Sequence, residues 1–485
     1  MNERQKRTPL FDCLKRHAAR DPWQFHIPGH KKGAGMDPEF AAFIGRNALA
    51  IDLINIAPLD DLHHPHGAIY EAQQLAAEAF GADATFFSVQ GTSGAIMTMV
   101  MAVCKPGDKI VVPRNVHKSV LTAIIYAGAH PLFLHPEMDE NIGIAHGITV
   151  SAVEKVLRKH PDVRAVLVIN PTYYGIAANL EEIVRLTHRF DIPVLVDEAH
   201  GVHTHFHESL PLSAMQAGAD MAATSVHKLG GSLTQSSVLN VRTDRIDLGR
   251  VQTAISMLTT TSTSYVLLAS LDAARRYLAT SGHARIADTL QLAEKARRRI
   301  NELPGLSCVG REILRTEATY DMDESKLIIH VKELGISGFQ AETWLREQCN
   351  IEVELSDLYN VLCLVTTGDD AQSIAALVQG LTKLSNHYYS PRVKSPITVQ
   401  VPQIPQLALS PREAFYAPKE SVPFREAAGR VTAEFVMIYP PGIPVLLPGE
   451  VVTADNLAYI EKHLDAGLPV QGPEDETMRH LQVVK

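Results

Sequence analysis

The chain of 485 residues is 46% hydrophobic and 20% charged, and its formal net charge is −9. This length exceeds what one hydrophobic core usually holds, so two or three domains of a soluble globular protein are expected. The acidic balance and the lack of a long basic stretch argue against a nucleic acid partner. No apolar run approaches the length of a membrane span.

Cysteine usage and the N-terminus predict a cytoplasmic protein. The five cysteines are odd in number and form no Cys-x-x-Cys pair. That pattern is typical of a reduced chain and not of a disulfide scaffold or a zinc module. The first eight residues are polar and charged, and they lack the apolar core of a signal peptide.

Periodicity divides the first two thirds of the chain into two parts. Residues 1–58 are expected to form an N-terminal arm, in which residues 23–30 contain too many turn formers for one regular element. Residues 59–305 alternate strand-length apolar runs with helix-length amphipathic stretches, which predicts a large α/β domain with a mostly parallel sheet covered on both faces. The expected strands are 85–89, 109–113, 165–169, 194–196, 221–224 and 238–241, and the expected helices include 119–127, 150–159 and 180–190.

Two smaller parts follow. Residues 306–390 are expected to form a smaller α+β domain. The proline-rich composition of residues 391–450 predicts that residues 391–485 form a C-terminal domain of loops and short elements. In the smaller domain the expected strands are 326–331 and 361–366, and the expected helices are 338–349 and 370–385.

The letters from Asp197 to His200 spell the Asp-Glu-Ala-His box of helicases, so nucleotide hydrolysis has to be tested. Such a site also needs a glycine-rich loop that ends in Gly-Lys-Ser/Thr and holds the phosphates. None of the thirty glycines is followed by lysine. This absence argues strongly against a nucleotide hydrolase.

A lysine and an acid are expected to meet at the edge of the sheet. Asp197 ends a very apolar strand, and Lys228 follows the next short strand and precedes two glycines. Ligands of parallel sheets bind beyond the carboxyl ends of the strands. Pyridoxal phosphate needs such a pair, because a lysine amine forms a Schiff base with its aldehyde and a carboxylate keeps its ring nitrogen protonated.

A possible phosphate site precedes both residues in the chain. Gly91-Thr92-Ser93-Gly94 follows an expected strand and opens a helix that runs to about residue 104. Backbone amides at a helix N-terminus bind anions well. Ser225 and His227 are close enough in sequence to Lys228 to bind the same phosphate.

Seven motifs in order carry a resemblance that extends over essentially the whole chain. They are HIPGHKKGAG from His26, LDDLHHP from Leu59, SVQGTSGA from Ser88, VPRNVHKS from Val112, VDEAHGVH from Val196, SVHKLGGSLTQSS from Ser225 and YPPGIPVLLPGE from Tyr439. With these motifs the sequence resembles the Orn/Lys/Arg decarboxylases, which have the aspartate-aminotransferase fold of pyridoxal-phosphate enzymes (fold type I). It is most similar to the short Bacillus-type arginine decarboxylases, which lack the N-terminal wing domain of the acid-induced enzymes.

The resemblance implies roles for individual residues. Lys228 would bind the cofactor covalently, Asp197 would pair with its ring nitrogen, and His117 would stack on its ring. Without the resemblance, His117 would be interpreted as a structural or surface histidine. His200 stands where the longer relatives have tryptophan, and it would touch the cofactor's phenolic oxygen or the substrate carboxylate. The phosphate would be held by Thr92, Ser93, Gly94, Ser225 and His227.

Recognition of a basic side chain requires a carboxylate, and arginine gains from a two-pronged contact. The segment from residue 350 to 357 is acidic and is expected to be extended, which would place Glu352 and Glu354 on one face. A solvated edge strand is the alternative interpretation. By the resemblance we expect Glu354 to contact the distal end of the substrate, with Asp357 as a second acid.

Histidines at 200, 203, 205 and 207, and at 63, 64 and 66, raise the question of a metal. No acid or cysteine completes a familiar spacing, so no metal site is predicted.

The expected activity is the decarboxylation of arginine to agmatine, which feeds putrescine and spermidine synthesis, in a homodimer or larger homo-oligomer with its active site between subunits. The alternatives are the same reaction on lysine or ornithine, another pyridoxal-phosphate reaction, or an inactive regulatory homologue.

Overall fold

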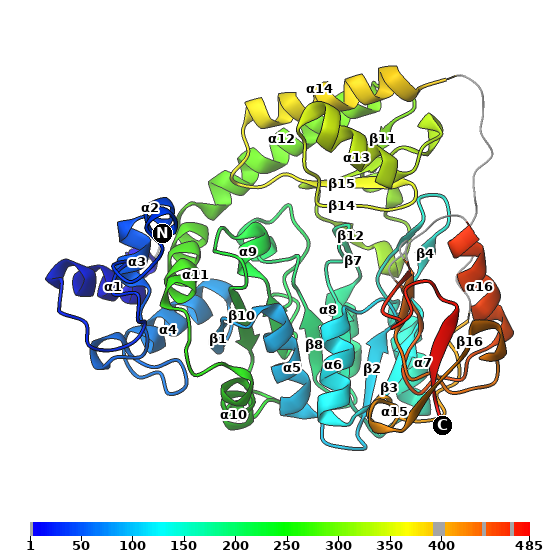
Figure 1. Ribbon diagram of the computed structural model, residues 1–485, viewed down its shortest axis with the longest axis horizontal. Coiled ribbons are helices and arrows are strands. Elements are labelled where there is room, and N and C mark those ends of the chain that lie inside the picture. The colour runs from blue at the N-terminus through cyan, green and yellow to red at the C-terminus, as the bar shows by residue number, and fades with distance from the viewer. Residues whose placement is uncertain (1–2, 391–402, 439–442, 466–469) are drawn as a thin grey trace. The chain divides into compact units, whose positions relative to one another are not determined.

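The computed structural model describes residues 3–390, 403–438, 443–465 and 470–485. The chain folds into two compact units, each built from segments that are distant in sequence. Unit 1 comprises Met1–Ala102 and Leu195–Ala287, and unit 2 comprises Val103–Val194 and Asp288–Lys485. Figure 1 shows the chain coloured from its N-terminus to its C-terminus. The boundaries expected near residues 58, 305 and 390 stay predictions.

The strands of unit 1 lie in the order β1-β10-β9-β8. Strands β8 and β9 are parallel, whereas β10 runs antiparallel to both β9 and β1. Nearly every strand residue is buried, as expected for apolar strands that are covered on both faces. The bounds are β1 Ala84–Ser88, β8 Val194–Asp197, β9 Met221–Thr224 and β10 Ser237–Val241.

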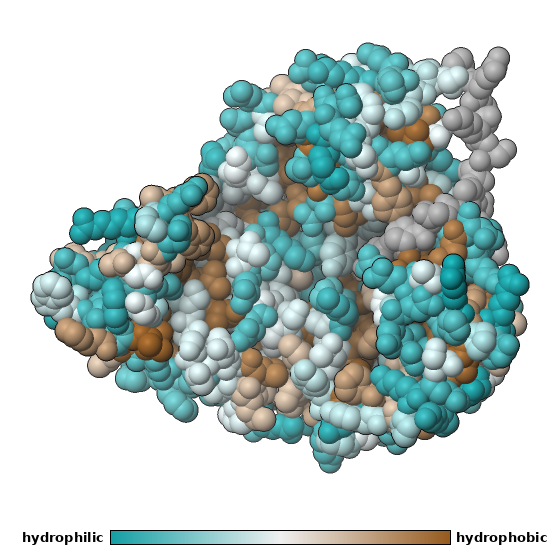
Figure 2. Space-filling model, viewed as in Figure 1, coloured by the Kyte–Doolittle hydropathy of each residue, from teal (hydrophilic) through white to brown (hydrophobic). Residues whose placement is uncertain are grey.

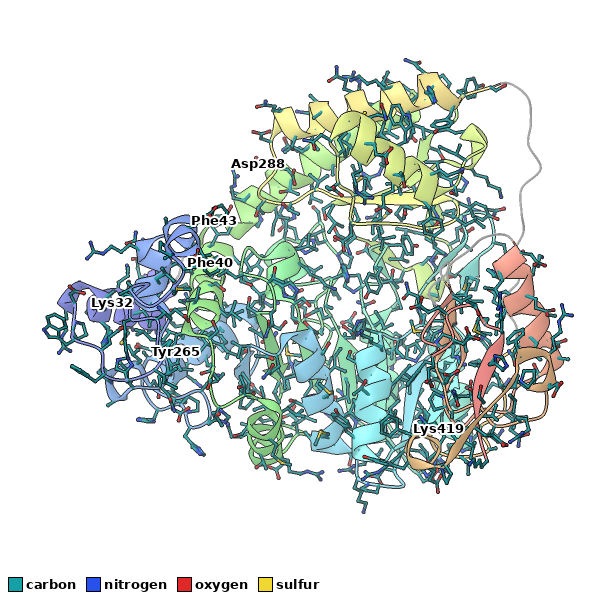
Figure 3. The ribbon with its side chains drawn as sticks, in the orientation of Figure 1. Lys32, Phe40, Phe43, Tyr265, Asp288 and Lys419 are labelled. Atoms are coloured by element: carbon teal, nitrogen blue, oxygen red, sulfur yellow. The ribbon has the colours of Figure 1, made fainter. Side chains whose placement is uncertain are left out.

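The N-terminal segment of unit 1 is helical. Helix α1 (Pro9–Arg20) packs against α4 (Ala68–Phe80) and α11 (Tyr265–Tyr277). The hydroxyl of the fully buried Tyr265 donates a hydrogen bond to the carbonyl of Asp60, and Figure 3 labels this tyrosine. The remaining helices are α2 Pro38–Ile44, α3 Arg46–Ile51, α5 Gly91–Val103, α9 Val226–Leu229 and α10 Leu248–Leu258.

Residues 23–30 form no helix or strand, as expected from their turn formers. Trp23 and Phe25 are more than 90% exposed, and Phe43 of α2 is 88% exposed. Figure 3 labels Phe40 and Phe43 on this helix, and Figure 2 shows apolar surface among the N-terminal helices.

The first sheet segment of unit 2 is parallel throughout, in the order β6-β2-β3. Strands β2 and β6 and the three helices lie where the alternating pattern predicts them, within about two residues, whereas strand β3 was not predicted. The bounds are β2 Lys109–Pro113, α6 Lys118–Ala127, β3 His130–Leu134, α7 Val150–Lys159, β6 Val163–Ile169 and α8 Leu180–His188. Short antiparallel pairs join β4 (Met138–Asp139) to β5 (Ile144–Ala145) and β7 (Ile176–Ala177) to β12 (Asp321–Met322).

The expected smaller α+β region contains an antiparallel sheet in the order β11-β13-β15-β14. Helices α13 and α14 pack on each other, and Figure 1 shows both beside β14 and β15. Their shared core includes Leu327, Ile329, Leu345 and Leu381, all fully buried. The bounds are α12 His283–Asn301, β11 Ser307–Cys308, β13 Lys326–His330, α13 Gly338–Cys349, β14 Leu355–Ser356, β15 Asn360–Leu364 and α14 Ala371–Tyr388.

The described part of the C-terminal segment consists of short strands and two helices around its own apolar core, which includes Phe424, Val436 and Ile460. Part of the YPPGIPVLLPGE motif, residues 439–442, lies outside the described residues. The bounds are α15 Pro411–Tyr416, β16 Lys419–Pro423, β17 Val436–Ile438, β18 Ile443–Leu446, α16 Ala454–Asp465, β19 Val470–Gln471 and β20 His480–Val484. Among the described residues, no helix has both the length and the apolar character needed to cross a membrane.

Candidate active site

Lys228 and Asp197 come from neighbouring parallel strands of unit 1. Asp197 is the last residue of β8, and Lys228 lies on α9, the short helix that follows β9. Because β8 and β9 are parallel, their carboxyl ends lie at the same edge of the sheet. The sequence prediction that these residues converge is therefore consistent with the strand pairing.

The amine of Lys228 contacts a buried histidine. Its Nζ lies 2.8 Å from Nε2 of His200, a residue that is 3% exposed. A lysine ammonium can only donate, so in its protonated form the amine requires a lone pair on Nε2 and a proton on Nδ1 of His200. The two side chains can therefore share one proton.

Asp197 is a buried carboxyl group with little to stabilise its charge. Its Oδ1 accepts one hydrogen bond, 3.2 Å long, from the amide of Ala199. Burial raises its pKa to about 6, against the opposing effects of that hydrogen bond and of the Lys228 charge. Such a group favours a cationic partner, and a protonated pyridine nitrogen is one.

The neighbouring acid, Glu198, was not singled out in the sequence. It is 3% exposed, and burial raises its pKa to about 7. Its carboxylate accepts hydrogen bonds from the amide of Ala214 at 2.6 Å and from Oγ1 of Thr224 at 3.0 Å. The bond from Thr224 anchors the end of β8 to β9, and the bond from Ala214 ties it to the segment before β9. Its position as the second acid directly after an apolar strand could have identified Glu198 from the sequence.

The N-terminus of α5 forms a cluster of hydroxyl groups. Oγ1 of Thr92 makes hydrogen bonds with Oγ of Ser225 and, at 2.8 Å, with Oγ of Ser237. The helix begins at Gly91, so the amides of Thr92 and Ser93 are among the first of the helix and have no acceptor within it. Hydroxyls and free amides at a helix N-terminus suit a phosphate group.

A side chain at Gly94 would place its Cβ 2.7 Å from Cβ of Gln90, so this turn requires glycine. His227 donates from Nδ1 to the carbonyl of Ser236 at 2.9 Å. Among the described residues, His227 and Ser93 make no hydrogen bond to the hydroxyl cluster. Ser237, which the sequence did not identify, belongs to that cluster because β10 places it opposite Ser88.

Unit 1 thus contains three features that fit pyridoxal phosphate: a lysine amine beside a histidine, a buried acid at a strand end, and a hydroxyl-rich helix N-terminus. The lysine after a strand, the acid at a strand end and the glycine-rich helix start lie where the sequence predicted them, whereas the contact between Lys228 and His200 was not predicted.

His117 lies in unit 2, where it caps α6. Its Nδ1 accepts from the amide of Ser119 at 3.2 Å and lies 2.8 Å from that residue's Oγ. The histidine lines a cavity of about 580 Å³. Other residues that line the cavity include Thr172, Tyr173, Tyr174, Asp357, Phe435 and Met437. Stacking of His117 on the cofactor stays a prediction from the resemblance.

Asp357 lines this cavity, but its carboxylate is already hydrogen-bonded. It accepts from the hydroxyl of Tyr174 at 2.6 Å and from the amides of Tyr359 and Asn360, both at 2.8 Å. The side-chain amide of Asn360 donates to both of its oxygens. Burial raises the pKa of Asp357 despite these bonds. The arrangement suits a residue that holds Tyr174 in the cavity wall.

Glu354 is exposed. The strand that was expected to begin at residue 350 is shorter than predicted. Strand β14 comprises only Leu355–Ser356, because Asn350 ends α13 in a left-handed conformation and the chain must first turn. Glu352 pairs with Nε of Arg346 at 2.9 Å. Glu352 and Glu354 line one surface groove together with Ile351 and Val353, so the expected common face of the two glutamates stays a prediction.

A buried ion pair links the segment before His117 to the C-terminal segment. Arg114 and Glu450 have side chains that are each 1% exposed, and they form a two-pronged contact, with Nη2 to Oε2 at 2.8 Å. Arg114 also donates from Nε to the carbonyl of Pro444 at 2.9 Å. Both charged residues stand inside motifs that carry the resemblance, but nothing in those motifs predicts that the two residues pair.

Comparisons with known proteins agree with this geometry. Residues 8–373 match the family model described as Orn/Lys/Arg decarboxylase, major domain, and residues 397–469 match the C-terminal domain of the same family. The chain is 67% identical over 483 residues to an arginine decarboxylase of Halalkalibacterium halodurans, covering 99% of this chain and 98% of the relative. An arginine decarboxylase of Bacillus subtilis (strain 168) is 63% identical, with the same coverage.

Solved structures support the fold. The constitutive lysine decarboxylase of E. coli superposes with a TM-score of 0.84 at 22% identity, covering 99% of this chain and 82% of that chain. The serine palmitoyltransferase of Sphingomonas wittichii superposes with a TM-score of 0.56 at 15% identity, covering 74% of this chain and 86% of that chain. The expected α/β fold of type I pyridoxal-phosphate enzymes is confirmed.

Proposed function

Because the chain belongs to the Orn/Lys/Arg decarboxylase family, we propose that it removes the α-carboxylate of L-arginine, yielding agmatine and carbon dioxide. The observation that carries this choice of substrate is the 63–67% identity to arginine decarboxylases over at least 98% of both chains. The lysine decarboxylases among its relatives are 24–27% identical. Lysine and ornithine remain the alternative substrates.

When bound, pyridoxal phosphate accepts the electron pair that is left as the bond from Cα to the carboxylate breaks. Lys228 would hold the cofactor through Nζ and release it to the substrate amine. Asp197 would keep a proton on the ring nitrogen, since its buried carboxylate gains a cationic partner there. Thr92, Ser225 and the first amides of α5 would bind the phosphate.

Decarboxylation consumes one proton, which must reach Cα. Lys228 and His200 could deliver this proton, because their 2.8 Å contact lets a proton pass between Nζ of the lysine and Nε2 of the histidine. His200 would take the proton from Lys228 when the amine has to act as a nucleophile, and would return it when the amine acts as an acid. Loss of His200 should therefore slow turnover more than it weakens cofactor binding.

The test is release of carbon dioxide from arginine, lysine and ornithine in parallel assays with added cofactor. Preference for arginine supports the proposal, and preference for another of the three amino acids would change the substrate but not the family. Lys228→Ala should abolish both turnover and the visible absorbance of the bound cofactor. Normal activity in that variant would refute the assignment of Lys228. The absorbance band in the unaltered chain also distinguishes an enzyme from an inactive homologue.

We further propose that the enzyme works in the cytoplasm as a homodimer or larger homo-oligomer and that agmatine feeds polyamine synthesis. The support is the family membership and the 63–67% identity to arginine decarboxylases. Sedimentation of the purified protein tests the assembly. Loss of intracellular agmatine and spermidine after deletion of the gene tests the metabolic role.

A further inference from the structure

A cluster of metal-binding side chains lies outside the residues assigned to the cofactor. His207, Glu208 and His283 each offer a ligand atom, and all three atoms lie within 4.8 Å of one another. Nε2 of His283 is 2.9 Å from Oε2 of Glu208. The rings of His207 and His283 stack with centroids 4.7 Å apart and 26° between their planes. All three residues belong to unit 1.

The backbone on both sides positions these side chains. His283 is the first residue of α12 and directly follows a π-helical turn, η4 (Leu278–Gly282), at the end of α11. A π turn adds about one residue to a turn and so rotates the following side chains, and such turns are frequent at functional sites. His207 follows the 3₁₀ helix η3 (Thr204–Phe206), which packs against η4.

Close packing fixes the approach of the two segments. Cβ of Phe206 lies 3.5 Å from the point where a side chain would begin on Gly282. These two residues each lie one position before a histidine of the cluster. Each of the two histidines thus adjoins a residue of this contact, although 75 positions separate Glu208 from His283 in the sequence.

Two imidazoles and one carboxylate are a ligand set that suits Zn²⁺ and related divalent transition metals. The side chains of His283 and Glu208 are 67% and 77% exposed, so a metal can reach them and their charges are not desolvated. Metal binding would replace the hydrogen bond between them. Three protein ligands leave at least one position for water in a tetrahedral site.

We propose that His207, Glu208 and His283 form a surface site for Zn²⁺. The site joins the start of α12 to the segment after η3, and it stabilises the folded chain because the unfolded chain does not hold the three ligands together. The proposal differs from the expectation that no metal site is present, which stays untested. The sequence spacing around His207 did not indicate a metal site, because the second histidine ligand, His283, lies far along the chain.

The test uses the full-length protein with its cofactor, after removal of metals with a chelator. Calorimetric titration with Zn²⁺ should show a site that His283→Ala and Glu208→Gln each weaken at least tenfold. The cobalt-substituted protein should show visible absorption bands that disappear in the same two variants. Because the side chains of His283 and Glu208 are exposed, circular dichroism of the two variants should be unchanged.

The matched control is His480→Ala. His480 is an exposed histidine that also contacts a carboxylate, with Nδ1 at 3.7 Å from Oδ2 of Asp475, but it belongs to no three-ligand cluster among the described residues. Its loss should leave Zn²⁺ affinity unchanged. If His283→Ala binds Zn²⁺ as the unaltered protein does, or if no binding occurs at micromolar Zn²⁺, the proposal is wrong.

Discussion

The buried ion pair between Arg114 and Glu450 offers a quantitative test of how the C-terminal segment is held. Replacement of Glu450 by glutamine keeps the size of the side chain and one oxygen, so no cavity forms. The charge of Arg114 is then left 1% exposed and without its partner. Breaking a buried pair by removing one charge typically costs about 3–5 kcal/mol. We expect Glu450→Gln to destabilise this region by that amount.

The appropriate assay is local, because a chain of several domains does not unfold in one step. Hydrogen exchange of the amides in β17 and β18 reports opening of the C-terminal segment. A loss of about 3–5 kcal/mol in the free energy of local opening corresponds to roughly 10²- to 10⁴-fold faster exchange. The melting temperature measures whether the effect extends to the whole chain.

The matched control is Glu420→Gln on β16. Glu420 pairs with Arg430 in the same segment, but their side chains are 42% and 36% exposed. Exposed pairs contribute about 0–1 kcal/mol, so exchange should change little. A rescue variant carries Arg114→Met together with Glu450→Leu, since replacing both charges by apolar groups is often neutral or stabilising. Equal effects of Glu450→Gln and Glu420→Gln would refute the argument.

Three further predictions follow from the site. Without cofactor, the pKa values of Asp197 and Glu198 lie above their unfolded values, so the contribution of these two groups to stability is largest below their ordinary values of 3.8 and 4.5 and is lost as the pH rises through about 6 and about 7. Thermal melts of the apoprotein across that range should show the fall, and Asp197→Asn should reduce it. Glu354→Gln should raise the KM for arginine at least tenfold while cofactor affinity is unchanged; unaltered kinetics would place substrate recognition elsewhere. Tyr174→Phe removes the 2.6 Å hydrogen bond to Asp357 and should cost about 1–3 kcal/mol in the melting of unit 2; an unchanged melt would show that the bond contributes nothing.

The sequence predicted several helices and strands with small errors or none. Strand β9 and helices α7 and α13 have the expected bounds. Local signals suffice for such elements, because apolar periodicity and turn residues act within a few positions. The placement of Asp197 and Lys228 follows from the same signals, since each stands directly after an apolar strand.

Contacts between distant segments could not be predicted in this way. Ser237 joins Thr92 only because β10 pairs with β1, and neither residue indicates that pairing. The partners Arg114 and Glu450 are 336 positions apart. The environment of Glu354 depends on how α13 ends, and a left-handed turn at Asn350 shortens the strand that alternation alone would extend.

The two adjacent acids at the end of β8, Asp197 and Glu198, are both buried, although carboxyl groups are rarely buried without a charged partner. A carboxyl pKa that rises from 3.8 to about 6 means that the ionised form of Asp197 is destabilised by about 3 kcal/mol. Glu198 is stabilised by hydrogen bonds from Ala214 and Thr224, whereas Asp197 accepts one long bond. The difference assigns the two acids separate tasks. Glu198 anchors the strand end, and under the proposed function Asp197 would gain its stabilisation from the protonated ring nitrogen of the cofactor. Cofactor affinity and the pH dependence of stability should therefore change together in Asp197→Asn, because both depend on the same buried charge.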